Sequence, residues 1–522
     1  MVLIHGINVL ADVPRHWARL RPSRTCTIFE DRFVSWADFD RYCTRVATGL
    51  IAEDVGPQGR IGYLGKNSDL YFQLLFGAAK ANVVMVAINS RLAAPEIEYI
   101  VGDAQAEILF VEPEYLGLVR RIASPSVRKI IVMGAAQDGL ETYDSWRDRQ
   151  SDVDPMVPSV PEDVCVQLYT SGTTGLPKGV QIMHLGLIAQ RLGYLATGEA
   201  WAQWSDEEVA MIPMPVFHVG GTGWGFQGFY HGATQVILAQ AEAGAIIDAI
   251  QRHKVNNVFV VPAVLRTMLL HEAAKTADFS HVRVVHYGAS PIPEDVLVRA
   301  MATFNCPFVQ RYGMTEASGT ITYLPPEQHV AGSPRLRSCG IPFPGSRVII
   351  GDENDVELPR GQVGEILIQA PWLMKGYWNM PEATAQAMRG GWYHSGDAGY
   401  MDDEGFIYIH DRVKDMIVSG GENIYPAEVE SALSHHPAIS DVAVIGVPSE
   451  RWGEEVKAVV VLEPGASLTE QELIAFARTR IGGYKVPKSV DFIDVLPRNP
   501  SGKLLKKELR EPYWAGHVRR VG

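Results

Sequence analysis

The chain has 522 residues, with 47 Lys and Arg against 60 Asp and Glu, a formal net charge of −13 and 47% hydrophobic residues. This apolar content is enough to build a buried core and excludes a mainly disordered chain. The negative charge excludes a nucleic-acid binder that works through bulk positive charge. At about 100–200 residues per domain, the length allows roughly three domain-sized units.

Cysteine usage and the N-terminus bear on the compartment. The five cysteines lie far apart and are odd in number, which favours neither a zinc site nor a disulfide framework. The first residues lack a basic segment and reach Asp12 and Pro14 too early for a signal peptide. No apolar run approaches the ~20 residues needed to span a bilayer. We therefore expect a cytoplasmic protein without a transmembrane segment; homodimer formation and peripheral membrane contact stay open.

Helix and strand patterns alternate along the first 300 residues. Ser35 and Asp38 resemble a capping box, and an apolar face at helical spacing follows between residues 36 and 50. Helices are also predicted over residues 264–274 and 294–304. Short apolar runs typical of buried strands occupy residues 83–88, 108–111, 130–133, 164–169, 258–261 and 282–287. This alternation predicts an α/β fold with largely parallel sheets covered by helices on both faces.

The last third of the chain has a different texture. Residues 346–370 consist of short β-type runs with Gly and Pro turns, which predicts a small barrel-like or antiparallel subdomain. After Asp411, a helix beginning at Pro426, strands at 442–447 and 458–462, and a helix capped by Thr469 follow. About a hundred residues of this kind predict a small α+β domain.

The loop after the strand at 164–169 is the most informative stretch. Residues 169–180 read Tyr-Thr-Ser-Gly-Thr-Thr-Gly-Leu-Pro-Lys-Gly-Val and contain three glycines together with Lys178. Glycines bring backbone N–H groups close to an anion, hydroxyls add donors, and the lysine adds charge. Pro177 and Gly179 flank Lys178 where a Walker A loop requires Gly and Ser or Thr. The pattern predicts a phosphate-binding loop of another kind.

This loop resembles the phosphate-binding signature of the acyl-adenylate-forming enzymes, in particular the acyl-CoA synthetase and fatty-acid–CoA ligase branch. The family's other motifs follow in order over nearly the whole chain: Met214-Pro-Val-Phe-His218, Tyr287-Gly-Ala-Ser-Pro291, Tyr312-Gly-Met-Thr-Glu316, His394-Ser-Gly-Asp397, Asp411-Arg-Val-Lys-Asp415 and Pro500-Ser-Gly-Lys503. The resemblance implies a large N-terminal domain over residues 1–411, with two helix-flanked sheets and a barrel-like subdomain. A hinge at 412–415 and a mobile C-terminal domain at 416–522 would complete it.

The resemblance implies an ATP-dependent ligase that first joins a carboxylate to the α-phosphate of ATP and then passes the acyl group to a thiol. Thr315 would contact the α-phosphate, and Glu316 with Thr170 would hold Mg²⁺, a hard cation that bridges phosphates. Lys503 would be catalytic, lying between the carboxylate and the α-phosphate as charge develops. The phosphates would be held by Thr170, Ser171, Gly172, Thr173, Thr174, Gly175 and Lys178.

The same resemblance assigns residues to the nucleoside and to CoA. The adenine would lie against Tyr312 and Gly313 and beside the backbone of Gly288, Ala289 and Ser290. Asp397 would accept hydrogen bonds from both ribose hydroxyls, and Arg412 would donate to the same sugar. Lys414 matches the hinge position of the family. Gly420, Gly421 and Glu422 would line the pantetheine channel of CoA after the small domain has rotated.

The acyl pocket is expected around His218, where the family places His or an aromatic residue beside the carboxylate. Small residues follow, and because Gly removes side-chain volume, the wall should leave room for more than acetate. The expected acid-binding residues are His218, Gly220, Gly221, Trp224, Gly288, Met314 and Gly319. A medium- or long-chain fatty acid is expected first. A ring-bearing acid, cinnamate-like or with a steroid side chain, is the alternative.

Three other functions compete with a CoA ligase. An adenylating enzyme could load a carrier protein in trans, because the sequence contains nothing that resembles a fused carrier domain. A luciferase-like oxygenase is a weaker candidate. A nucleotide- or acyl-binding protein without catalysis is disfavoured, since Lys178, Glu316, Asp397 and Lys503 are all present.

Overall fold

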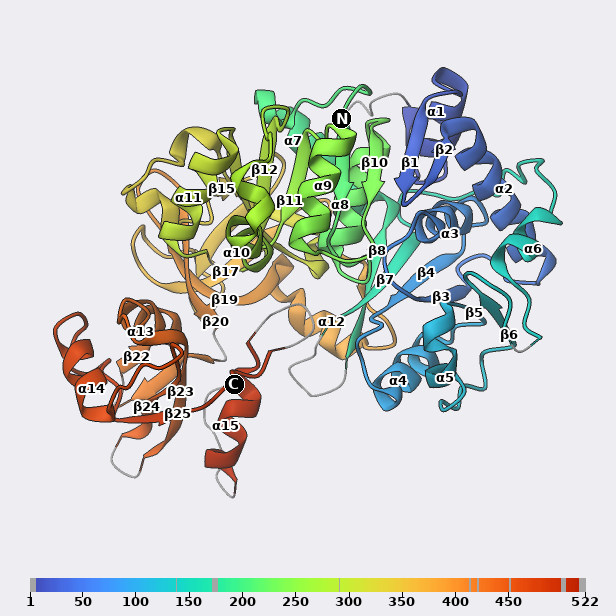
Figure 1. The fold of residues 1–522 in the computed structure, drawn as a ribbon. Helices are drawn as coiled ribbons and strands as arrows, with labels where there is room; N and C mark the ends of the chain where they lie inside the picture. Colours follow the sequence, from blue (N-terminus) through green and yellow to red (C-terminus); the bar gives the residue numbers. More distant parts are fainter. Residues whose placement is uncertain are drawn as a thin grey trace. The chain divides into compact units, whose positions relative to one another are not determined.

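The computed structural model describes residues 6–137, 139–170, 177–290, 292–412, 415–419, 422–449, 452–498 and 504–515. The chain divides into two compact units (Figure 1). The first contains residues 1–347 and 369–391, and the second contains residues 348–368 and 392–522. Among the described residues, no helix is both long and apolar enough to cross a membrane.

A nine-stranded sheet dominates the first unit. Its central strands are parallel, and antiparallel strands close both edges. In spatial order the strands are β15 (Ile341–Pro342), β14 (Gly319–Leu324), β13 (Phe308–Met314), β12 (Val284–Gly288), β11 (Asn257–Val260), β9 (Val209–Ile212), β10 (Thr234–Ile237), β1 (Thr25–Phe29) and β2 (Arg32–Ser35).

A seven-stranded sheet forms the other half of this unit. Its parallel strands end in an antiparallel pair that carries the predicted phosphate loop. In order the strands are β18 (Gly376–Tyr377), β8 (Lys178–Met183), β7 (Val164–Thr170), β4 (Val84–Ile88), β3 (Arg60–Leu64), β5 (Ile108–Val111) and β6 (Lys129–Val132). The two largely parallel sheets confirm the predicted α/β class.

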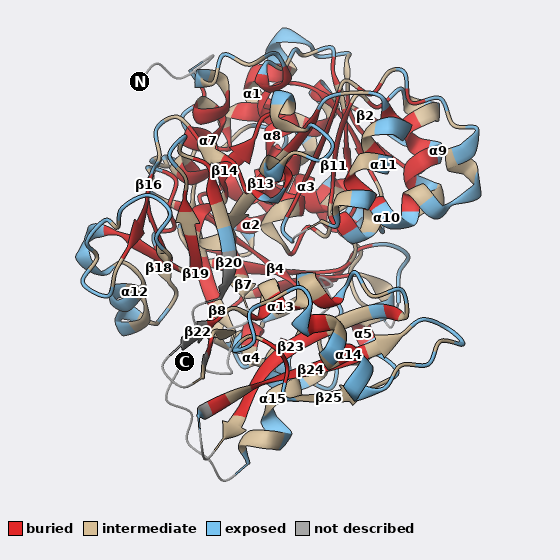
Figure 2. Ribbon diagram, turned by 90° about the vertical axis from the view of Figure 1, so that its left-hand side faces the viewer, coloured by how far each residue is buried: buried red, intermediate tan, exposed pale blue. Residues whose placement is uncertain are grey.

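Helices cover both sheets of this unit, and buried residues concentrate on the strands and on the helix faces against them (Figure 2). One face of the nine-stranded sheet packs against three amphipathic helices: α9 (Ala243–His253), α10 (Pro262–Leu270) and α11 (Glu294–Phe304). The remaining helices are α1 (Asp12–Leu20), α2 (Trp36–Ala52), α3 (Asp69–Lys80), α4 (Ala94–Ala104), α5 (Leu116–Val119), α6 (Tyr143–Asp148), α7 (His184–Ala196), α8 (Val219–Tyr230) and α12 (Pro381–Ala387).

Helix α3 is buried on all sides because it contacts strands of both sheets. Its aromatic residues pack against α8, where the Phe72 and Phe229 ring centroids are 4.9 Å apart. Lys80 at its end is fully buried, and its Nζ donates to carboxylates of Asp40 and Asp154 at 2.6 and 2.7 Å. Pairing with two carboxylates offsets the desolvation of this charge. Residues Asp69–Lys80 therefore form a core helix, and the strand predicted at residues 83–88 is β4.

The capping box predicted at the start of the first long helix is confirmed in part. The Ser35 Oγ accepts from the Asp38 backbone N–H at 3.1 Å and donates to the Asp38 carboxylate at 2.8 Å. The predicted apolar face of α2 is buried, with residues 36, 39, 43, 46 and 50 each 0% exposed. The Asp38 carboxylate accepts from the Ser35 hydroxyl, whereas in a full capping box it would accept from the backbone N–H of Ser35.

The second unit has two sheets. One contains β16 (Arg347–Gly351), β17 (Gly364–Gln369), β19 (Tyr393–Met401) and β20 (Ile407–Arg412), with β17, β19 and β20 antiparallel. The other contains β22 (Glu422–Ile424), β21 (Ile417–Ser419), β24 (Gly453–Leu462), β23 (Ile439–Ser449) and β25 (Ser489–Phe492). The helices are α13 (Pro426–Leu433), α14 (Glu470–Arg478) and α15 (Lys506–Trp514).

Thr469 and Glu472 form the predicted capping box of α14, and Pro426 begins α13 as predicted. The β-rich sheet belongs to the same compact unit as these C-terminal residues. The hinge at 412–415 and the movement of residues 416–522 stay predictions, and Val413 and Lys414 lie outside the described residues.

We predict that the protein loses stability in mild acid because two histidines of the first unit are fully buried. Burial lowers the pKa of His184 to about 4 and lowers that of His286 further, with the charge of Arg311 adding to the effect. The unfolded chain binds these protons first, so the free energy of unfolding should fall as pH decreases from about 6.5 to 4. The expected loss is roughly 1 kcal/mol per pH unit for each histidine.

Urea unfolding at pH 7 and pH 5 measures this loss. The His184→Gln variant should show a shallower pH dependence than the wild type, because one of the titrating groups is gone. A free energy of unfolding that is equal at the two pH values would contradict the prediction.

Candidate active site

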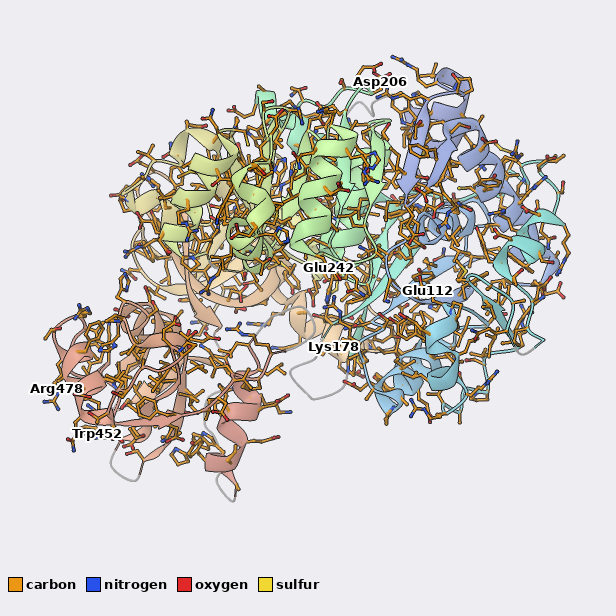
Figure 3. All side chains as sticks on the ribbon, viewed as in Figure 1. Glu112, Lys178, Asp206, Glu242, Trp452 and Arg478 are labelled. Atoms are coloured by element: carbon orange, nitrogen blue, oxygen red, sulfur yellow. The ribbon has the colours of Figure 1, made fainter. Side chains whose placement is uncertain are left out.

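The two ends of the predicted phosphate loop are neighbours across a pair of strands. Thr170 ends β7, Lys178 begins β8, and the two residues are partners in the antiparallel register. In Figure 3 the label Lys178 marks the first residue of β8. The loop residues Ser171, Gly172, Thr173, Thr174 and Gly175 lie outside the described residues.

Glu316 lies beside Thr170, in the single helical turn Thr315–Ala317 between β13 and β14. Its Oε1 accepts from the Tyr377 hydroxyl at 3.0 Å and from the Thr170 hydroxyl at 3.5 Å. The Lys178 Nζ is 4.8 Å from the centre of the Tyr377 ring. Three segments that are far apart in the sequence therefore bring a carboxylate, a hydroxyl and an ammonium group together.

This group of side chains fits a Mg²⁺ ion that is shared with phosphates. Glu316 and Thr170, the two predicted metal ligands, are both hard oxygen donors. Among the described residues there is no cluster of three or more His, Cys, Asp or Glu side chains that could hold a metal alone. Mg²⁺ characteristically takes one or two carboxylates and completes its shell with water and phosphate oxygens.

The residues expected around the adenine lie at the carboxyl ends of two neighbouring parallel strands. Gly288 ends β12 and pairs with Arg311 of β13, so the segment at 288–290 and Tyr312 meet at one edge of the sheet. A Cβ at Gly288 would lie 2.1 Å from the Arg311 carbonyl oxygen, so this position excludes a side chain. Ala289 has a φ of +68°, a left-handed conformation that is uncommon for a residue with a Cβ.

Gly313, Met314 and Gly319 surround the turn that carries Thr315. A Cβ at Gly313 would lie 1.8 Å from the carbonyl oxygen of Gly319, so β13 and β14 approach too closely for a side chain here. Met314 is half-buried. Met314, predicted to bind the acid, and Thr315, predicted to contact the α-phosphate, are thus consecutive in one tight connection between strand and turn.

Asp397 belongs to the second unit, where it is 5% exposed on β19. Its register partner on β20 is Arg412, whose backbone alone is described. Glu365 of β17 holds the residues of β19 just before Asp397: its Oε1 accepts from the Gly396 N–H and its Oε2 contacts His394 Nδ1, each at 2.9 Å. Glu365 therefore fixes the backbone that presents the predicted ribose-binding carboxylate.

We predict that Glu365→Ala raises the KM for ATP by about tenfold, because the hydrogen bonds that hold the β19 residues before Asp397 are lost. The measurement is pyrophosphate release at varied ATP and 2′-deoxyATP. If Glu365 acts through ribose recognition, the preference for ATP over 2′-deoxyATP should shrink in the variant. The exposed Glu353→Ala change on the same unit is the control. A lowered melting temperature with an unchanged nucleotide preference would contradict this role.

His218 stands at the N-terminus of α8, between the Met-Pro-Val-Phe segment and the glycine-rich helix. The ring is partly exposed, but its Nε2 is covered and has no hydrogen-bond partner among the described residues. Desolvation, assisted by the positive charge of Arg91, lowers the pKa of His218 to about 4. At neutral pH the imidazole is therefore uncharged and can exchange a hydrogen bond with a carboxylic acid or a thiol.

The structure corrects the expected role of Gly221 as open acyl-pocket wall. Gly221 is buried, and a Cβ there would lie 2.2 Å from the Pro215 carbonyl oxygen and 2.6 Å from that of Met214. The space that the missing side chain leaves is filled by backbone of the preceding segment. At Gly220, in contrast, a Cβ would contact the Phe259 ring at 3.3 Å. Trp224 is buried, and its indole N–H donates to the Met211 carbonyl at 2.8 Å.

Gly221→Ala should therefore destabilise the protein by roughly 1–3 kcal/mol, as overpacking against immobile backbone does. Gly223→Ala is the matched control on the same helix, because its Cβ would meet nothing closer than the Val219 methyl at 3.4 Å. Ala also has the higher helix propensity, so this control should be neutral or slightly stabilising. Urea unfolding of both variants measures the difference. Equal stabilities would contradict the close-packing role of Gly221.

Several predicted site residues are not described by the structure. Lys503, Lys414, Gly420 and Gly421 lie outside the described residues, and only the backbone of Glu422 is described, in β22. Two residues that contact predicted site residues or their neighbours were not expected from the sequence: Tyr377, which contacts Glu316, and Glu365, which contacts Gly396 beside Asp397. Neither residue belongs to one of the family's motifs. The residues next to each of them in the sequence form no pattern that predicts a function.

Comparison with known proteins decides the family. A model of the AMP-binding enzyme family matches residues 14–378, and the model of its C-terminal domain matches residues 428–503. The chain belongs to the AMP-binding enzyme family. It is an ATP-dependent, adenylate-forming acid–thiol ligase, as the order of its motifs predicts. A binding protein without catalysis and a luciferase-like oxygenase are therefore no longer considered.

Relatives cover the chain from end to end. A fatty acid–[acyl-carrier-protein] ligase of Streptomyces coeruleorubidus is 39% identical over 99% of this chain and 98% of its own length. A feruloyl-CoA synthase of an Amycolatopsis species is 37% identical over 97% and 99%. A solved fatty acyl CoA synthetase of Mycobacterium tuberculosis is 32% identical, with a TM-score of 0.78 over 98% of this chain and 99% of that one.

Proposed function

We propose that this ligase activates a carboxylic acid larger than acetate as its acyl-adenylate and transfers the acyl group to CoA. The observation that carries the proposal is the convergence of Glu316 and Tyr377 with Thr170 and Lys178, the described ends of the predicted phosphate loop. In-line displacement at phosphorus requires positioning and neutralisation of spreading negative charge, which these groups can supply.

In the first half-reaction, Lys178 and the loop would hold the β- and γ-phosphates while Thr315 contacts the α-phosphate. Mg²⁺, held by Glu316 with Thr170, would supply charge neutralisation across the phosphate oxygens. Lys503 would lie between the carboxylate and the α-phosphate. Asp397, oriented by Glu365, would receive the ribose hydroxyls, and the neutral His218 would stand beside the acid.

In the second half-reaction, residues 416–522 would rotate about the hinge at 412–415. The segment containing Gly420, Gly421 and Glu422 would then line the channel for the pantetheine thiol. One active site would serve both steps, with the adenylate held in place while the acceptor replaces the catalytic lysine.

A carrier protein is the second candidate acceptor, and the 39% identity to a fatty acid–[acyl-carrier-protein] ligase favours keeping it. Supplying preformed acyl-adenylate with either CoA or a phosphopantetheinylated carrier protein separates the two. Faster acylation of CoA supports the proposal. Faster acylation of the carrier protein would overturn the choice of acceptor while leaving the adenylation step intact.

Acid choice is tested by pyrophosphate release across short, medium, long, aromatic and steroid carboxylic acids. A fatty acid and a ring-bearing acid both remain candidates, because relatives with names of both kinds are similar over nearly the full chain. The filled space beside Gly221 removes one argument for a long alkyl chain. Absence of ATP-dependent pyrophosphate release with every acid would refute the proposed function.

A further inference from the structure

Two arginines are buried side by side between the nine-stranded sheet and the helices α7 and α8. Arg191 of α7 is 1% exposed and Arg311 of β13 is 7% exposed. The Nη1 of each donates to the same atom, Gln227 Oε1 of α8, at 2.5 Å from Arg191 and 3.1 Å from Arg311. One neutral amide oxygen therefore serves two guanidinium groups.

The other partners of these arginines are neutral as well. Arg191 also donates to the Gln190 side chain and to the Leu187 carbonyl. Arg311 also donates to the Tyr194 hydroxyl at 2.9 Å and to His286 Nδ1 at 3.2 Å. Within the part of the chain that the structure describes, no hydrogen bond or ion pair joins either arginine to a carboxylate.

A buried cationic pair without a counter-ion is costly, because buried charges are ordinarily paired. Burial lowers the pKa of Arg191 to about 10, with the charge of Arg311 contributing, and burial lowers the pKa of Arg311 as well. Packing and stability alone do not explain two buried arginines, because apolar residues of similar volume would cost less free energy at these positions. The arrangement is explained if an anion or a strong hydrogen-bond acceptor binds there.

The arginines lie directly behind residues expected to form the acyl pocket. The Arg311 guanidinium is 5.2 Å from the Trp224 ring centre, and the ring of His286 is 5.1 Å from the same indole. On the β14 side, a Cβ at Gly319 would lie 2.9 Å from the side-chain amide of Gln190. Trp224 therefore lies against Arg311, and Gly319 approaches Gln190, which accepts a hydrogen bond from Arg191.

Gln227, which accepts from both arginines, and Ser318, the chain neighbour of Gly319, have hydrogen-bonding capacity left over. Gln227 and Ser318 are both 0% exposed. The Nε2 of Gln227 and the Oγ of Ser318 are buried and have no hydrogen-bond partner among the described residues. Together with the guanidinium groups, they offer donors to an oxygen that arrives from the pocket.

We propose that Arg311, Arg191 and Gln227 form the inner end of the acyl pocket and recognise an oxygen at the far end of the acid, a carboxylate, a phenol or a ketone. This inference rests on the proposed acid-activating function and narrows its substrate class. A plain alkyl end would leave the Nε2 of Gln227 and the Oγ of Ser318 without a partner among the described residues. Sites built to hydrogen-bond a substrate discriminate strongly against analogues that lack the partner.

The experiment compares matched acids in the ATP-dependent pyrophosphate-release assay. Each pair differs only at the far end: 4-hydroxycinnamate with cinnamate, decanedioate with decanoate, and 9-oxodecanoate with decanoate. The wild type should prefer the oxygen-bearing member of at least one pair by about tenfold or more in kcat/KM, because a hydrogen bond to a charged group contributes a free energy of this size. The pair with the largest preference identifies whether the oxygen is phenolic, anionic or a ketone.

Arg311→Met should abolish this preference by lowering kcat/KM for the oxygen-bearing acid while sparing its matched partner. Arg311→Lys, which keeps a cationic donor, should retain part of the preference. The exposed Arg337→Met change on the same unit is the control and should leave both acids unaffected. If Arg311→Met does not fold, the Gln227→Leu variant and the substrate preference of the wild type still test the proposal.

Three results are distinguishable. If none of the acids supports pyrophosphate release, the proposed function fails. If acids are activated but the wild type shows no preference within any pair, this inference alone is overturned. A uniform loss with both members of a pair in the Arg311 variants would also overturn it, because the arginines would then act only in packing.

Discussion

Lys503→Ala should lower acid-dependent pyrophosphate release by at least about 10²-fold, since a single charge-stabilising group at a transition state is worth that much. The reason is local: the acid and the α-phosphate are both negative, and a flexible ammonium group between them is the only predicted cation that contacts both. Acyl transfer from supplied acyl-adenylate should change little, because the phosphorus–oxygen bond has already formed. The two half-reactions are measured separately, as pyrophosphate release and as thioester formation.

Neighbouring lysines provide the matched controls. Lys507 is exposed on α15, so Lys507→Ala should leave both half-reactions intact. Lys506 pairs with Glu430 at 2.9 Å within the second unit, so Lys506→Ala tests a structural ion pair of the same domain. Equal loss of both half-reactions in Lys503→Ala would show that the residue supports the fold and does not act in adenylation.

The second large effect is expected at Glu316. Glu316→Ala removes the carboxylate that contacts Thr170 and Tyr377, and adenylation should fall by about 10²-fold with a higher Mg²⁺ requirement. Pyrophosphate release titrated with MgCl₂ measures both quantities. Glu316→Gln keeps the shape and an acceptor for the Tyr377 hydroxyl but loses the charge. Its activity should lie closer to that of the Ala variant.

Tyr377→Phe is the control for this prediction. It removes the hydroxyl that donates to Glu316 but keeps the ring beside Lys178, so the loss should correspond to one hydrogen bond, about 1 kcal/mol. If Glu316→Ala and Tyr377→Phe have the same activity and the same Mg²⁺ dependence, Glu316 does not hold the metal. A retained Mg²⁺ half-saturation in Glu316→Ala would lead to the same conclusion.

Local patterns in the sequence predicted most of the elements that carry the site. The apolar run at 164–169 became β7, the stretch at 294–304 became α11, and Thr469 with Glu472 capped α14. These features depend on side-chain spacing within one turn or one strand, so the order of residues alone contains the information. Lys178 was predicted within the loop, whereas the structure places it as the first residue of β8, paired with Thr170.

Contacts across the sheets could not be derived in this way. Tyr377 reaches Glu316 because the two-residue strand β18 pairs with β8, and Glu365 reaches Gly396 because β17 lies beside β19. Such partners are set by strand order and register over tens of residues, and a shift of one residue would turn each side chain to the opposite face. Neither residue has a local pattern that predicts its contact.

The sequence by itself determined the reaction class, because the adenylate-forming motifs are short and each keeps its chemistry in one segment. Only the tertiary structure decided what the apolar and glycine-rich segments do. It filled the space beside Gly221 with the backbone of Pro215, and it brought Arg191 and Arg311 onto one glutamine. The physical reason is that volume and charge compensation are properties of a packed interior, where the neighbours come from distant parts of the chain.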